Sequence, residues 1–310
     1  MKPHFLAALL FAAASGAQAQ FNASIEPYQK IAVTSGRVTD SRSQAGSPGE
    51  LAAQVSDTGT DGSGQPFSAS SSASTRLGPG YLSGSAAMRF SGTGAASMSL
   101  TAYQGDVLTF QRNDAGFDNE LIVHYNIVIA GGTTASIDPV ASPPGAGKEA
   151  GSLDWTFVHQ LGDRYLTSWD SKTQLAYDGS VVTTSHWNVS EIGQVYGVYS
   201  FSAAVMAGES LNMALYMEMK SRLNAAGAST TGAMAGDAPS IYWGGISQVT
   251  DWYGNLVDYR VASASGFNYA LSAVPSPAPE PATWLLLIAG ATVLGLLGRR
   301  RASATRPASA

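Results

Sequence analysis

Few residues of this 310-residue chain stand at spacings that support a known chemistry. Asp57 and Asp61 begin a calcium-loop pattern, but a glycine stands where the third oxygen ligand belongs and Ser68 replaces the closing glutamate. A polar turn is therefore the preferred interpretation. Lys148 follows a partial P-loop that lacks its leading glycine and its hydroxyl residue, and residues 92–94 lack the third glycine of a dinucleotide-binding motif.

Carboxylates and histidines form no specific catalytic pattern. Asp114, Asp118 and Glu120 cluster before a predicted strand, and two carboxylates about 5–10 Å apart can hydrolyse a glycosidic bond. Because the chain has 22 acidic residues, some pair meets that distance in any fold. Three histidines without zinc-ligand spacing lie between the ends of the chain: His124, His159 and His186. We predict structural or surface roles for them, and no catalytic residue, cofactor or metal site.

Aromatic side chains are the best candidates for ligand contact. Indole faces stack on sugar rings, although packing in a core is the commoner use of a tryptophan. Five tryptophans lie between the ends of the chain: Trp155, Trp169, Trp187, Trp243 and Trp252. Trp252 and Tyr253 stand at a predicted hairpin tip, where little core is available to bury them. These two residues are the candidate glycan contacts.

Alternating polarity predicts strands rather than helices. Residues 211–219 and 121–129 each place five apolar side chains on one face. Residues 194–205 are predicted to turn back into the strand at 211 as a hairpin, and a second hairpin is expected around residues 251–255. Residues 56–75 suit either a flexible linker or two thin strands, with strands preferred. The fold class is all-β, an antiparallel β-sandwich with jelly-roll-like connections.

Composition excludes several functional classes. The chain has no cysteine, so disulfides, thiolate metal sites and thiol catalysis are excluded. Residues 20–274 hold 12 basic and 21 acidic residues, a net charge of −9. Nucleic-acid binding needs clustered Lys and Arg, so no nucleic-acid partner is expected.

The N-terminal end is typical of a secretory signal peptide over residues 1–19. Lys2 supplies the positive charge, residues 5–14 are apolar, and Ala17 and Ala19 supply the small side chains that signal peptidase requires. The mature chain is expected to begin at Gln20 with the ectodomain, residues 20–274.

The C-terminal end has the features of a membrane anchor. Residues 275–281 form a proline-rich linker, and the uncharged residues 282–298 are long enough for a short transmembrane helix. Trp284 lies at the outer edge of this span. Residues 299–310 form a basic tail that the positive-inside rule places in the cytoplasm, so the ectodomain faces the periplasm.

These terminal features, taken in order, resemble a PEP-CTERM sorting signal. The residues that carry the resemblance are Pro279, Glu280, Pro281, Trp284, Arg299, Arg300 and Arg301. The resemblance implies processing by an exosortase after a transient stay in the inner membrane, and delivery to the cell surface or outside the cell; a permanent anchor is the alternative. Residues 242–246 and 265–269 more loosely resemble the endings of uncharacterised exported proteins of this kind, which implies no activity.

The sequence thus favours an exported, non-enzymatic surface or matrix protein that associates with exopolysaccharide or with surface proteins. Two alternatives stay open, a secreted glycan-active hydrolase with an Asp/Glu pair and a carbohydrate-binding module.

Overall fold

The computed structural model describes residues 28–34, 38–60, 64–114, 119–138, 149–188 and 190–275. Within these ranges the chain forms thirteen strands and no helix, and the strands pair antiparallel. The strands are β1 (Tyr28–Thr34), β2 (Thr39–Ala45), β3 (Gly49–Thr60), β4 (Pro66–Gly78), β5 (Tyr81–Arg112), β6 (Glu120–Ile137), β7 (Glu149–Leu161), β8 (Tyr165–Ala176), β9 (Val181–Trp187), β10 (Ser190–Ile192), β11 (Gly197–Met206), β12 (Ser210–Thr250) and β13 (Tyr259–Ser263). The all-β prediction is confirmed.

Two long strands, β5 and β12, fold over together. They pair antiparallel from Ser210 opposite Thr109 to Tyr242 opposite Tyr81. A straight strand would hold Gly84 and Leu100 about 50 Å apart. In the fold, however, a Cβ on Gly84 would lie 3.4 Å from the Leu100 side chain. One continuous hydrogen-bonded sheet therefore becomes two facing layers.

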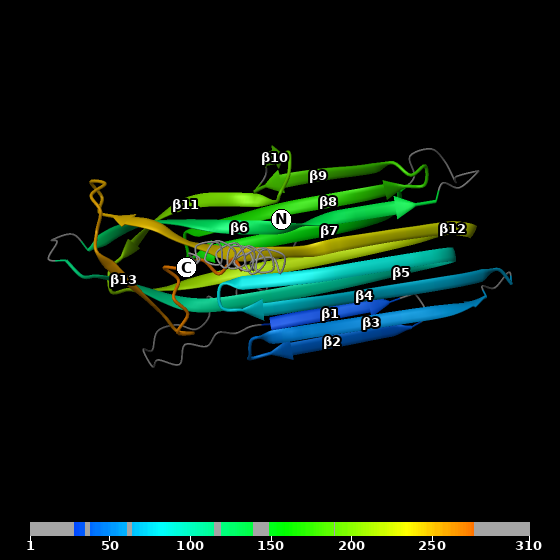
Figure 1. The fold of residues 1–310 in the computed structure, drawn as a ribbon, viewed down its shortest axis with the longest axis horizontal. Coiled ribbons are helices and arrows are strands. Elements are labelled where there is room, and N and C mark those ends of the chain that lie inside the picture. Colours follow the sequence, from blue (N-terminus) through cyan, green and yellow to red (C-terminus); the bar gives the residue numbers. More distant parts are fainter. Residues whose placement is uncertain are drawn as a thin grey trace, which may run out of the picture. The chain divides into compact units, whose positions relative to one another are not determined.

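Each layer is built on one half of β5 and one half of β12 (Figure 1). The first layer has the order β2-β1-β5-β12-β7-β8-β9-β10, with β13 beside the end of β5. The second layer adds β4 and then β3 to residues 81–91, and β6 and then β11 to residues 232–250. Two antiparallel layers with a shared core are consistent with the predicted β-sandwich.

Glycines form the corner where β5 passes between the layers. Gly92 and Gly94 have φ values of +99° and +134°. A Cβ on Gly92 would lie 2.4 Å from the carbonyl oxygen of Pro66, so only glycine fits there. The ladder of β12 is interrupted at the same point, between Gly227 and Thr231. The glycines at 92 and 94 thus have a structural role.

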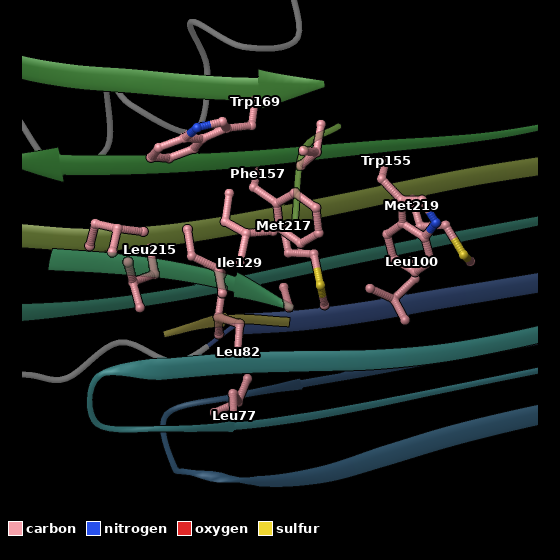
Figure 2. Close-up of a cluster of buried hydrophobic side chains, with 14 of the residues drawn as sticks. Leu77, Leu82, Leu100, Ile129, Trp155, Phe157, Trp169, Leu215, Met217 and Met219 are labelled. Carbon is pink, nitrogen blue, oxygen red and sulfur yellow. The ribbon is translucent and has the colours of Figure 1, made fainter. Parts of the chain in front are cut away.

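The core lies between the layers and contains the inward faces of the alternating strands. Figure 2 shows Leu82, Ile129, Phe157 and Met217, which come from different strands, gathered in one cluster. Of the predicted apolar faces of residues 211–219 and 121–129, all members are buried in it except Leu211, which is half-buried against it. Residues 56–60 lie in β3 and residues 66–75 in β4, and the two strands pair, as preferred for this stretch. Ala69, Ser71, Ala73 and Thr75 face inward.

The predicted hairpin between residues 194–205 and the strand at 211 is wrong. Strand β11 pairs with β6 in the second layer, whereas β12 begins in the first layer between β5 and β7. Residues 207–209 cross between the layers, with Ala207 N–H donating to Asn119 and Gly208 N–H donating to Phe110. Alternation identifies a strand but does not say whether its successor lies beside it or opposite it.

The end of the described chain, residues 264–273, is tied into the core and is called here the closing segment. The Trp243 indole donates to the carbonyl of Tyr269 at 2.8 Å, and the Gln104 amide donates to the Tyr269 hydroxyl at 3.3 Å. Ala273 N–H donates to the carbonyl of Trp243 at 2.8 Å. The closing segment thereby lies beside β12 at Trp243, one residue beyond Tyr242, which pairs with the first residue of β5.

The glycine corner leads to a stability prediction. Gly92→Ala should lower the free energy of unfolding by about 2–3 kcal/mol, because it adds a collision with the Pro66 carbonyl to an unfavourable positive φ. Denaturant unfolding of the full-length protein measures the effect. Gly46→Ala is the control, since Gly46 has a φ of +89° but open space around it, and it should cost about 1 kcal/mol. Equal losses would show that the collision contributes nothing.

Candidate functional site

The two predicted glycan contacts are described by the structure, whereas the predicted sorting residues are not. Within the described ranges, no helix is both long enough and apolar enough to cross a membrane. The following predicted residues lie outside those ranges: Ala17, Ala19, Pro279, Glu280, Pro281, Trp284, Arg299, Arg300 and Arg301. The described residues between 28 and 275 therefore supply the geometry considered next.

The tip of the hairpin at residues 251–255 is held by one carboxylate. Asp251 Oδ1 accepts hydrogen bonds from the backbone N–H groups of Tyr253 and Asn255, each at 2.9 Å. Asp251 Oδ2 accepts from the Asn255 side-chain amide at 2.9 Å. Gly254 has a φ of +86°, the conformation that glycine adopts readily, and its N–H donates to the Asp251 carbonyl. The expected turn is confirmed, but the predicted hairpin extends no further than one bridge, Thr250 with Leu256, because residues 259–263 pair with β5 instead.

This turn presents aromatic side chains to solvent. Trp252 is 64% exposed and Tyr253 is 82% exposed, and Leu256 beside them is 76% exposed. The chain closes the turn with a bridge from Thr250 to Leu256 and then leaves for β13 in the other layer. An exposed aromatic pair on an ordered turn suits contact with an external ligand.

The other four tryptophans pack in the core or at its margin. Trp155, Trp169 and Trp243 are each 1% exposed or less. Trp187 on β9 is 38% exposed and lies 5.5 Å from the ring of Tyr199 on β11, across the open side of the two layers. Core packing is therefore confirmed for three of the four.

The three histidines lie on different strands and differ in burial and in the residues that they contact. His124 lies on the outer face of β6, where its Nδ1 is 2.7 Å from the hydroxyl of Ser202. His186 is half-buried on β9. His159 is fully buried, with ring centroids of Tyr125 at 5.3 Å and Phe201 at 6.0 Å, and burial lowers its pKa to about 3.

Among the acidic residues considered in the sequence analysis, Asp114 is in an ion pair and Asp57 lies within a strand. Asp114 pairs with Arg112, Glu120 begins β6, and Asp118 lies outside the described residues. Asp57 lies within β3, paired with Ala69, so residues 57–60 form part of a strand rather than a calcium loop. Among the residues with described positions, no group of three His, Asp or Glu side chains is arranged to hold a metal ion.

Comparison with protein-family models gives no match to this chain, and comparison with curated protein sequences gives none either. The functional argument therefore depends on the residues themselves.

The pairing of two aromatic residues was not predicted from the sequence. Tyr81 and Tyr242 stand directly opposite each other on the outer face of the second layer, although 161 positions separate them in the chain. Each belongs to a stretch whose apolar pattern indicates only a strand. The pairing register that brings them together has no local signal in the sequence.

The Asp251 carboxylate provides a test of the turn. Its pKa lies below the ordinary 3.8, first because of the hydrogen bond from the Asn255 side chain. The turn is therefore favoured above pH 3.8 and loosens as the pH falls through the lowered pKa. In Asn255→Ala the carboxyl should titrate closer to 3.8 by ¹³C NMR. An unchanged midpoint would contradict the proposed hydrogen bond.

Buried His159 predicts an acid sensitivity. Its folded pKa of about 3 lies below the ordinary 6.5, so the unfolded chain binds the proton more readily. The free energy of unfolding should then fall by about 1 kcal/mol per pH unit as the pH drops from 6.5 toward 3. His159→Phe should remove this slope in urea titrations, whereas His186→Phe should keep it. A wild-type slope in His159→Phe would refute the assignment.

Proposed function

We propose that this chain is an exported cell-surface or extracellular-matrix protein sorted by a PEP-CTERM/exosortase system. The observation that carries the proposal is the order of features at the C-terminal end. Pro279-Glu280-Pro281 precede Trp284, an uncharged stretch of 17 residues at 282–298, and three consecutive arginines. Signal peptidase releases the N-terminus, and the C-terminal helix holds the ectodomain on the periplasmic side of the inner membrane until exosortase processes the tail.

In this proposal the ectodomain is a jelly-roll-like sandwich that associates with exopolysaccharide or with surface proteins, without catalysis. The exposed Trp252 and Tyr253 support a glycan contact, because flat aromatic faces attract the C–H bonds of sugar rings. The hydrogen bonds of Asp251 support it too, since an ordered turn loses less conformational entropy when a ligand binds. A carbohydrate-binding module is a separate alternative, and a glycan affinity that falls when Trp252 or Tyr253 is replaced by alanine would favour it.

A glycan-active hydrolase remains the alternative from another class. Asp114 is paired with Arg112, and three of the tryptophans that would line a sugar cleft are buried in the core. No feature within the described ranges favours it over binding. Measuring polymer length in the binding experiment below separates the two, since only a hydrolase shortens the polymer.

Sorting is tested by replacing Pro279, Glu280 and Pro281 with alanine in the source bacterium. The processed form should disappear and the full-length protein should accumulate in the inner membrane, because exosortase has lost its recognition element. Immunoblots of membrane and medium fractions against the ectodomain measure this. The control replaces Pro275 and Pro277 in the same linker, and should process normally. Normal processing of the triple variant would reject the sorting proposal.

Glycan contact is tested by co-sedimentation of the full-length protein, in detergent, with the exopolysaccharide of the source bacterium. Trp252→Ala with Tyr253→Ala should weaken binding about three- to tenfold, as expected for the loss of aromatic stacking. Val182→Ala is the control, since Val182 is 56% exposed on a different strand, β9. Equal binding by the double variant and the control would remove the hairpin from the proposed site.

A further inference from the structure

The outer face of the second layer holds a pair of tyrosines whose ring planes are nearly parallel. Tyr81 on β5 and Tyr242 on β12 are directly opposite each other, with ring centroids 6.2 Å apart and 23° between the ring planes. Their chain neighbours Leu82 and Ile241 are fully buried, so alternation turns both tyrosines outward, where they are half-buried. We call Tyr81 and Tyr242 the tyrosine platform.

A glycine on the neighbouring strand leaves room for the Tyr81 ring to pack against the backbone of the sheet. Gly78 on β4 is the register partner of Tyr81. A Cβ at Gly78 would fall 2.5 Å from a ring carbon of Tyr81, so the ring lies across the glycine backbone. An aromatic ring placed over a cross-strand glycine is a stable arrangement in sheets. The ring therefore covers backbone on one side and forms part of the outer face on the other.

Polar pairs continue the same face along β6 and β11. Val128 is the register partner of Tyr242, and one step further along β6 the Ser200 hydroxyl donates to Asn126 Oδ1 at 2.8 Å. At the next step Ser202 bonds to His124 at 2.7 Å.

Beside these polar pairs, β12 has a glycine. Gly244 supplies no side chain between Tyr242 and Asn126, and a Cβ there would lie 2.8 Å from the Asn126 Cβ. Gln248 then stands opposite His124 and is exposed. Amide and hydroxyl groups that both donate and accept hydrogen bonds thus lie next to the tyrosine platform.

The chemistry of this face matches an uncharged, hydroxyl-rich chain. The charged neighbours of Tyr81, Arg76 on β4 and Glu50 on β3, form an ion pair at 2.8 Å and so carry no net charge together. The net charge of −9 on residues 20–274 repels acidic polymers. Ring faces carry partial negative charge and attract the C–H edges of pyranose rings, while amides and hydroxyls pair with sugar hydroxyls.

We propose that the tyrosine platform and the adjoining Asn126–Ser200 and His124–Ser202 pairs bind a neutral polysaccharide. This inference rests on the proposed glycan association and specifies the class of glycan, but it assigns the contact to a different surface from the Trp252–Tyr253 hairpin.

The test uses the full-length protein in a sugar-free detergent, lauryldimethylamine oxide, because glucoside detergents would compete. Depletion isotherms are measured on amorphous cellulose, insoluble β-1,3-glucan and mannan, with calcium alginate beads as the acidic comparison. We expect binding to at least one neutral polymer, tighter than to alginate. Tyr242→Val should weaken it about tenfold while keeping strand propensity, and Tyr242→Phe should stay within about threefold.

Further variants keep the result decisive. Gly78→Ala retains both tyrosines but displaces the Tyr81 ring, so it should also weaken binding. Near-UV circular dichroism shows whether each variant folds. If Tyr242→Val fails to fold, Tyr81→Val is used in its place. Wild-type affinity in the tyrosine-to-valine variants overturns the platform, as does absence of binding to all three neutral polymers. Loss in Trp252→Ala alone would support the hairpin of the proposed function and reject the platform.

Discussion

The antiparallel ladder between β5 and β12 joins the two layers, because both strands run through both of them. Every other strand adds to one half of this ladder, so the position of each depends on where the two strands bend. At the bend the backbone must adopt positive φ while passing within contact distance of Pro66. Glycine at 92 meets both requirements, and a Cβ there would disturb the corner from which both layers extend.

The closing segment makes the end of the domain part of its core. Tyr269 is fully buried and bonded to Gln104 on β5, and Trp243 on β12 contacts the segment through its indole and its backbone. The proline-rich linker, which starts at Pro275, therefore follows closely after Ala273, whose N–H is bonded to Trp243. Removal of a tail beyond residue 275 would leave all of these contacts in place, which agrees with a domain proposed to function after processing.

The aromatic residues divide into two groups according to backbone geometry. Inward positions of strands hold Trp155, Trp169 and Trp243, which supply packing area to the core. Turn and outer-face positions hold Trp252, Tyr253, Tyr81 and Tyr242. Ionised groups lie beside both sets: the Asp251 carboxylate holds the turn of Trp252 and Tyr253, and the Arg76–Glu50 ion pair lies next to Tyr81. The proposed glycan contacts therefore depend on the ring faces rather than on an uncharged surface.

The sequence alone determined the strand class, the inward faces of residues 213–219 and 121–129, and the exposed turn at 251–255, because alternation and turn chemistry are local properties. It also supplied the whole sorting hypothesis, which depends on residue order near the ends. Only the tertiary structure decided that β11 and β12 lie in different layers and that residues 92–94 form a corner. The pairing of Tyr81 with Tyr242 was decided there too, since strand register depends on long-range hydrogen bonds and on packing across the core.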